Sequence, residues 1–390
     1  MGRSIDHGEV STSSRIRRPA VVVLAVLGCL LSIVSVFAVW GRNQVLNTDR
    51  YLATVVPLSA DPAIQDEISK KVSTAIIAKL DAADRAKEAL PTQAGFLATP
   101  IGDAVNTMVT KRTAKFVHSD SFQKLWKELN RVGHQQLVDI LNGSGGKALQ
   151  VNGGKLQLDL GQVVDEVRTR LVDAGLTIVT AMPPITLVVD IADAQGIEKA
   201  RTVVHRLDQL ANILPFLALA CLTGAALLSR RRLRSTVLVA EGLMFSMVLV
   251  RLALALAARL VVDQVPASSA SPDAVRAFYQ QLTTFLRDGV VVIGLVSALV
   301  AGLLVVIAPI RGAVAHRPLT GAAWPATRGV VRHTITILAG VVLLVAAPSV
   351  TTLVLTAVVA GLLWWLVGRF GSRFGESALV LPAPRPAVAR

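Results

Sequence analysis

The sequence predicts an α-helical membrane protein with six transmembrane helices and an α+β extracytoplasmic domain between the first and the second of them. Hydrophobic residues make up 53% of the 390 residues, and the mean hydropathy is +0.57. They gather in long uncharged runs, which is typical of helices that cross a bilayer core of about 30 Å. Residues 41–208 contain no such run and are numerous enough for a folded domain with its own core.

The first transmembrane helix (TM1) is predicted at residues 19–40, after a cytoplasmic tail of residues 1–18. The run is uncharged and follows Arg15, Arg17 and Arg18, and about 20 residues at 1.5 Å each cross a bilayer. A cleaved signal peptide would have a shorter apolar run of about 7–15 residues. A lipoprotein signal would turn polar after Cys29, whereas this run continues beyond it. We therefore expect an uncleaved anchor.

The first half of the domain is predicted to be helical. Apolar residues repeat every four positions from Ile64 to Leu80, and Asp61-Pro62 supplies a helix start. Weaker helical patterns cover residues 101–116, and a stronger one runs from Ser119 to Leu141. Residues 91–100, between two prolines, are expected to form a loop.

The second half of the domain changes to a period of two. Residues 149–151 and 156–160 alternate around Asn152-Gly153-Gly154, which predicts a β-hairpin. Residues 185–190 alternate again, and they predict a third strand of a small sheet. A helix is expected between them, at residues 161–174.

The remaining apolar runs predict five further spans. They are TM2 at 210–229, TM3 at 236–262, TM4 at 289–310, TM5 at 334–347 and TM6 at 350–368. The pieces between and after them are an outer loop with a short helix (263–288), a basic cytoplasmic loop (311–333) and a basic, proline-rich cytoplasmic tail (369–390).

The arginines predict the orientation. Each of the four segments placed in the cytoplasm (1–18, 230–235, 311–333 and 369–390) carries four basic residues, whereas the outer loop is slightly acidic. This bias predicts that both termini are cytoplasmic and that residues 41–208 are extracytoplasmic. Because the net charge of +14 comes from arginines at the ends of apolar runs, we expect no nucleic-acid partner.

One candidate polar site lies within the predicted membrane helices. Arg251 is in TM3, eight residues and about 12 Å inside Arg259, where an arginine costs about 2.5–3.5 kcal/mol unless it faces protein or water. Glu241 is on the same helix but about 15 Å away along the axis, too far for a direct pair. Arg251 could contact a ligand, ion or partner, or it could snorkel outward or bind a structural carbonyl.

A second candidate is a polar face in the extracytoplasmic domain. Trp126, Asn130 and His134 recur every four residues and share one face of the predicted helix at 119–141, with Arg131 adjacent. This face could bind a ligand, or its polar groups could bond to neighbouring backbone and close the core.

No catalytic, cofactor-binding or metal site is predicted. The chain has no H-E-x-x-H, G-x-S-x-G or C-x-x-C motif, and residues 143–148 lack the first glycine and the hydroxyl residue of a P-loop. Its two cysteines, Cys29 and Cys221, lie in apolar runs and predict no disulfide framework. We expect a protein that is not an enzyme.

Several motifs resemble a known family. They are WGRNQVLNTDRYLATVVPLSADPAIQ at residues 40–65, the spacing Phe122-x₃-Trp126-x₃-Asn130-Arg131-x₂-His134, and Asn152-Gly153-Gly154-Lys155-Leu156-x-Leu158-Asp159-Leu160. The chain resembles actinobacterial multi-pass integral membrane proteins of uncharacterised function. The resemblance implies an anchor helix, an extracytoplasmic domain and carboxyl-terminal membrane helices, and it implies no reaction, cofactor or substrate.

Two functions follow as hypotheses. The first is a non-enzymatic membrane protein of the cell envelope whose extracytoplasmic domain binds an envelope component or a partner protein. The second is a transporter or lipid-handling component with a polar site in the membrane bundle around Arg251. In both cases the lipid bilayer is an expected partner.

Overall fold

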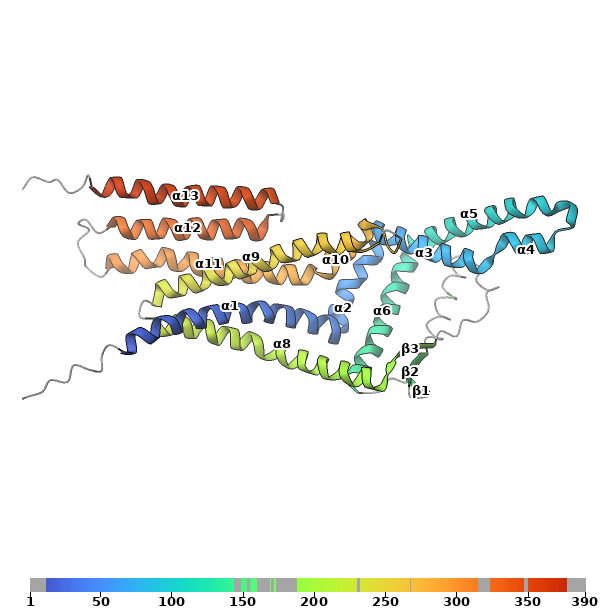
Figure 1. The fold of residues 1–390 in the computed structure, drawn as a ribbon, viewed down its shortest axis with the longest axis horizontal. Helices are drawn as coiled ribbons and strands as arrows, with labels where there is room; N and C mark the ends of the chain where they lie inside the picture. Colours follow the sequence, from blue (N-terminus) through green and yellow to red (C-terminus); the bar gives the residue numbers. More distant parts are fainter. Residues whose placement is uncertain are drawn as a thin grey trace, which may run out of the picture. The chain divides into compact units, whose positions relative to one another are not determined.

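The computed structural model describes residues 12–143, 149–152, 155–159, 188–229, 232–266, 268–314, 323–346 and 350–376, with isolated positions at 169 and 172 (Figure 1). The chain divides into two compact units. The bundle unit consists of Met1–Phe37, Asn212–Leu256 and Leu286–Arg390, and the domain unit consists of Ala38–Ala211 and Ala257–Phe285. Several long helices contribute residues to both units.

The bundle unit is built from long apolar helices that pack through small residues. A Cβ added at Gly28 in α1 would lie 2.7 Å from Leu222 of α8, and one added at Gly294 in α11 would lie 2.5 Å from Leu344 of α12. Glycine at these points lets the helices approach closely. The helices are α1 (Thr12–Leu46), α8 (Ala194–Leu228), α9 (Arg232–Gln264), α11 (Thr284–Val314), α12 (Ala323–Val345) and α13 (Val350–Glu376).

The prediction of six transmembrane helices is wrong. Of the described helices, four are long and apolar enough to cross a membrane: Pro19–Leu46, Glu198–Leu228, Arg232–Gln264 and Thr284–Ile307. The segments expected to be TM5 and TM6 lie in α12 and α13, whose apolar parts are only Gly329–Val345 and Thr351–Val367. At 1.5 Å per residue each reaches about 26 Å, which is less than a bilayer core of about 30 Å. The helix α12 also begins at Ala323, inside the segment expected to be a cytoplasmic loop.

The domain unit consists mainly of helices joined by short connections (Figure 1). Helices α3 and α4 both pack on α5, and α4 approaches α5 so closely that a Cβ on Gly102 would lie 2.8 Å from Ala83. The elements are α2 (Thr48–Val55), η1 (Val56–Ala60), α3 (Pro62–Leu80), α4 (Ala82–Ala89), η2 (Thr92–Leu97), α5 (Ala98–Val117), α6 (Asp120–Leu141) and α10 (Pro272–Leu282).

The helix starts predicted from local chemistry are confirmed. The Asp61 side chain accepts hydrogen bonds from the backbone of Ala63 and Ile64 at the start of α3. The Ser119 hydroxyl accepts one from the Phe122 backbone at the start of α6. The loop expected at 91–100 is wrong, because η2 and the first turn of α5 occupy it.

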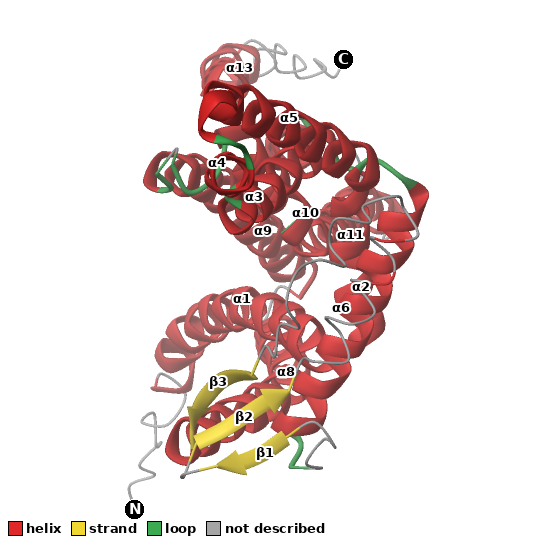
Figure 2. Ribbon diagram, turned by 90° about the vertical axis from the view of Figure 1, so that its right-hand side faces the viewer, coloured by secondary structure: helices red, strands yellow, loops and turns green. Residues whose placement is uncertain are grey.

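The predicted α+β class is also wrong, because nearly all of the described chain is helical. The strands β1 (Leu149–Asn152), β2 (Lys155–Asp159) and β3 (Val188–Asp193) have only four, five and six residues. They pair antiparallel in the order β1-β2-β3 (Figure 2). The helix expected at 161–174 falls almost entirely outside the described residues.

Two buried apolar clusters of the described residues lie between helices of the domain unit. One joins the end of α5 to the start of α6 through Phe116, Val117, Phe122 and Leu125. The other joins α2 to η1 through Leu52, Val55 and Leu58. This helical core positions the polar face of α6 against the end of α1 and against α2.

Candidate functional site

The polar face predicted on α6 exists, and its side chains are used inside the domain. His134 is 5% exposed, its Nε2 lies 3.0 Å from the carbonyl oxygen of Gln44, and its Nδ1 lies 3.0 Å from the hydroxyl of Thr48. A carbonyl can only accept, so Nε2 carries the proton and Nδ1 accepts from the Thr48 hydroxyl. Gln44 is in the last turn of α1, where carbonyls lack a partner within the helix. His134 therefore caps the carboxyl end of α1.

Two turns earlier on α6, Trp126 caps the carboxyl end of α2. Its Nε1–H donates to the carbonyl of Val55, the last residue of α2, over 2.9 Å. Between the two caps, Asn130 accepts a hydrogen bond from the Tyr51 hydroxyl at 2.9 Å and donates to the backbone of its own helix. The Tyr51 ring also stacks on His134 with centroids 4.1 Å apart, and its burial raises the pKa of the phenol.

Arg131 stands apart from this network. Its guanidinium lies 3.9 Å from the carboxylates of Asp49 and Glu128, both of which are well exposed. Exposed pairs at this distance contribute little to stability. Of the four residues predicted on this face, three are therefore joined in one buried network, and Arg131 remains at its exposed rim.

The hydrogen bonds of this network indicate the role of the α6 face. Trp126 and His134 are paired with helix ends and Asn130 is paired with Tyr51, so the face holds α6 across α1 and α2. The periodicity of the sequence placed the residues on one face, but it did not show which backbone groups they would meet.

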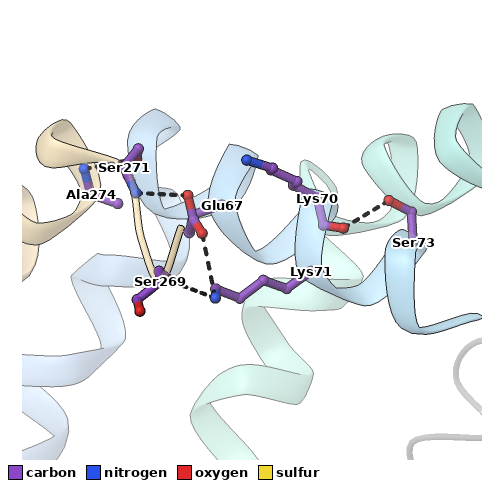
Figure 3. Close-up of polar contacts among 7 residues, drawn as sticks. All are labelled: Glu67, Lys70, Lys71, Ser73, Ser269, Ser271 and Ala274. Carbon is purple, nitrogen blue, oxygen red and sulfur yellow. Dashed lines mark hydrogen bonds and ion pairs between the residues drawn. The ribbon is translucent and has the colours of Figure 1, made fainter. Parts of the chain in front are cut away.

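Sequence reasoning missed a second polar contact, between α3 and the segment before α10 (Figure 3). Glu67 of α3 accepts a hydrogen bond from the backbone N–H of Ser271 at 3.0 Å, and Lys71 donates to the carbonyl of Ser269. The Ser271 N–H holds the pKa of Glu67 below its ordinary value. Ser271 is also the N-cap of α10, so this contact fixes the start of α10 against α3. The two segments lie about 200 residues apart in the chain, and no local pattern could indicate their pairing.

An apolar surface remains open on the domain unit. We call it the α5 surface and define it by Phe96 and Leu97 of η2 and Ile101 and Met108 of α5, which are 75, 40, 40 and 47% exposed. Beside Met108 a shallow groove of about 510 Å³ is lined by both acidic and basic side chains: Asp103, Lys111 and Arg112. On this part of the domain unit, exposed apolar side chains and charges therefore adjoin an unfilled groove.

Arg251 lies within the bundle unit, on α9. Its Nη2 donates to the carbonyl of Ala346, immediately after the last residue of α12, at 3.2 Å. Arg287 and Asp288 of α11, one basic and one acidic, both lie near enough to interact with it electrostatically. Arg251 therefore satisfies a structural carbonyl at a helix end, which is one of the two interpretations that the sequence left open.

Glu241, the other residue predicted for the bundle site, does not contact Arg251. It is 7% exposed, and its Oε1 lies 2.9 Å from Nδ1 of His333 on α12. The sequence missed His333 because it lay in a segment expected to be a loop. The structure thus separates the predicted site into a helix cap at Arg251 and an acid–imidazole pair at Glu241.

In the described residues, no group of three or more His, Cys, Asp or Glu side chains could hold a metal ion. The two cysteines, both in the bundle unit, are not bonded to each other. No protein-family model, no characterised protein and no solved structure matches the chain.

Proposed function

We propose that the chain is an integral membrane protein of the cell envelope, with its amino terminus in the cytoplasm and residues 41–208 outside the membrane. Its extracytoplasmic domain binds a partner protein and catalyses no reaction. This proposal includes membership of the actinobacterial family that the motifs resemble. Four helices of sufficient length and hydropathy support the membrane location.

The orientation is supported by the arginines and by parity. Arg15, Arg17 and Arg18 precede the apolar span of α1, and residues 230–234 carry four arginines at the connection from α8 into the first turn of α9. Both segments are expected to stay in the cytoplasm. Four spans are an even number, so they return the carboxyl terminus to the side of the amino terminus. The proposed orientation is therefore the same for four spans as it was for the six expected from the sequence.

The α5 surface is the observation that carries the binding function. Phe96 exposes three quarters of its surface, whereas Phe116 of α5 and Phe122 of α6 are buried. Exposed apolar groups bordered by polar residues mark interaction sites. The polar face of α6 is closed, so it offers no competing site.

The charges beside this surface favour a protein segment as the occupant. Asp103 precedes Met108 and Lys111 and Arg112 follow it, so both signs of charge line one groove. An amphipathic helix with an apolar stripe, and with an acidic end that meets Lys111 and Arg112, fits this arrangement. A uniformly anionic lipid surface would meet Asp103 unfavourably.

Photo-crosslinking in intact cells tests this proposal. A photoreactive residue placed at Ile101 should give a protein adduct of defined mass. Truncating an anchoring aromatic costs about 2 kcal/mol, or roughly 30-fold in affinity, so Phe96→Ala should nearly abolish the adduct. Phe278→Ala, at another exposed phenylalanine of the domain unit, should leave it intact.

Charge reversal tests whether binding depends on the charges beside the α5 surface or only on its apolar side chains. Lys111→Glu with Arg112→Glu should weaken the adduct, whereas Lys79→Glu with Lys87→Glu, a matched change elsewhere, should not. Adducts with lipid alone, or equal protein adducts in all variants, would contradict the proposal.

A second candidate function is a transporter or lipid-handling component, and one observation favours it. Acidic, basic and imidazole side chains meet other helices inside the bundle unit, at Arg251 and at Glu241. Such groups are expensive in a membrane unless they have a role. If neither Arg251→Leu nor Arg251→Lys changes the flux of lipids and solutes across proteoliposome membranes, Arg251 no longer supports this function.

A further inference from the structure

The pair formed by Glu241 and His333 joins two helices of the bundle unit. Glu241 lies on α9 and His333 on α12, 92 residues later, and their side chains meet at 2.9 Å. The carboxylate side chain is 10% exposed and the imidazole side chain 26% exposed. The acid is therefore enclosed, and the imidazole is the more accessible member of the pair.

The surroundings of Glu241 are apolar. The next turn of α9 carries Met244, which is fully buried and adjoins Gly340 of α12. On the neighbouring side, Cys29 of α1 lies against Gly242 and is the titratable group that α1 presents there. A carboxylate in such an environment is stable only when it is paired or protonated.

Two described arginines of these helices have contacts of their own. Arg332, the residue before His333, lies 4.5 Å above the Trp364 ring of α13. Arg251 is ten residues from Glu241, about 15 Å along α9, and binds the Ala346 carbonyl. Within the described bundle, His333 is the ionic partner that the geometry gives to Glu241.

These features define how protons are distributed over the pair. With one proton between them, the carboxyl and the imidazole are together neutral, whichever group carries it. Adding a second proton gives a net charge of +1, and removing the shared one gives −1. Since either charge would lie beside apolar side chains, this environment favours the neutral state in which the two groups share one proton.

We propose that Glu241 and His333 form a single proton-binding site between α9 and α12, which exchanges one proton with the solution on the side of the more exposed imidazole. The exchange is a simple acid–base step: water or hydronium gives a proton to the pair or takes one from it, and no other bond changes. The inference goes beyond partner binding and does not depend on the α5 surface.

Infrared difference spectroscopy of the full-length protein in lipid nanodiscs tests this site. When the pH is varied, a protonated-carboxyl band should appear with the same midpoint as the histidine ring bands of the unmodified protein. Glu241→Gln should abolish that band, and His333→Asn should move its midpoint by about one pH unit or more. The matched controls are Glu198→Gln, at an exposed glutamate of α8, and His205→Asn, at an exposed histidine. Neither control should abolish the carboxyl band or move its midpoint.

Two results would overturn the proposal. One is a carboxyl band that survives in Glu241→Gln, or a midpoint that is unmoved in folded His333→Asn. The other requires no variant: carboxyl and ring bands of the unmodified protein that titrate with separate midpoints would show that the two groups do not share a proton.

Discussion

His134→Phe is the substitution whose effect the structure defines most closely. Phenylalanine keeps an aromatic ring stacked on Tyr51 and fills a similar volume. It removes both hydrogen bonds, so the Gln44 carbonyl and the Thr48 hydroxyl lose their partner. A buried hydrogen bond contributes about 1–1.5 kcal/mol, so the loss of two should cost about 2–3 kcal/mol. The change should loosen the junction between α1 and α2.

Hydrogen exchange monitored by mass spectrometry can detect that loosening locally. A cost of 2–3 kcal/mol should raise opening of the segment 44–55 roughly 30- to 150-fold. His118→Phe is the matched control, because His118 is exposed and bonds mainly to the backbone of its own helix. It should change exchange by less than about threefold. If His134→Phe exchanges no faster than His118→Phe, His134 is not a cap.

Three further predictions follow from the domain unit. Trp126→Phe should destabilise the α2–α6 contact by about 1 kcal/mol in denaturant unfolding, because it loses the bond to Val55 but keeps its ring; no loss would refute the second cap. The pKa of Glu67 is lowered in the folded chain, so its contact with Ser271 should stabilise the protein above pH ~4.3 and fade as the pH falls through the folded pKa. Glu67→Gln keeps an acceptor and should remove this pH dependence from the exchange of residues 266–272; an unchanged pH profile would count against it. Gly102→Ala should lower the free energy of unfolding by about 1–3 kcal/mol, because its Cβ would meet the Ala83 backbone at about 3.0 Å. Gly133→Ala is the control, because a Cβ there meets open space, and it should raise the free energy of unfolding by up to about 1 kcal/mol. If Gly133→Ala proves the less stable of the two variants, α4 and α5 do not pack closely at Gly102.

Local chemistry was the part of the fold that the sequence could predict. The starts of α3 and α6 depend on Asp61 and Ser119, which act within three residues, and the structure confirms both. The face shared by Trp126, Asn130 and His134 depends only on helical periodicity. Their partners, Val55, Tyr51 and Gln44, come from about 70–90 residues earlier in the chain, and spacing alone does not reveal such pairs.

The predicted apolar stripe of α3 shows why tertiary packing escapes the pattern. The residues expected to face the core, such as Ile64 and Ile68, are only half-buried, while Gln65, Ser69 and Ser73 are buried. Gln65 finds a partner in the Ser59 carbonyl at 2.8 Å, and the small serines suit a close approach between helices. A hydropathy scale treats the burial of these polar residues as unfavourable. It takes no account of the hydrogen-bond partner of Gln65 or of the small size of the serines.

The membrane helices were miscounted for a related reason. Apolar composition identified the runs in α12 and α13, but the runs are too short for a bilayer core, and Arg332 and His333 extend α12 as a helix with polar contacts. The residue that pairs with Glu241 was therefore placed in a loop. A hydropathy scale ends a predicted membrane helix at a charged residue. A charged residue that contacts another helix can nevertheless lie within a continuous helix, as Arg332 and His333 do in α12.

We propose that residues 41–208 lie on the extracytoplasmic side of the membrane, and that the connection between α8 and α9 lies in the cytoplasm together with the first turn of α9. Single cysteines at Glu88 and Arg234, both exposed, can be probed in intact cells with a membrane-impermeant maleimide. We expect Glu88→Cys to react in intact cells and Arg234→Cys to react only after permeabilisation. Labelling of Arg234→Cys in intact cells, with Glu88→Cys protected until lysis, would contradict the account.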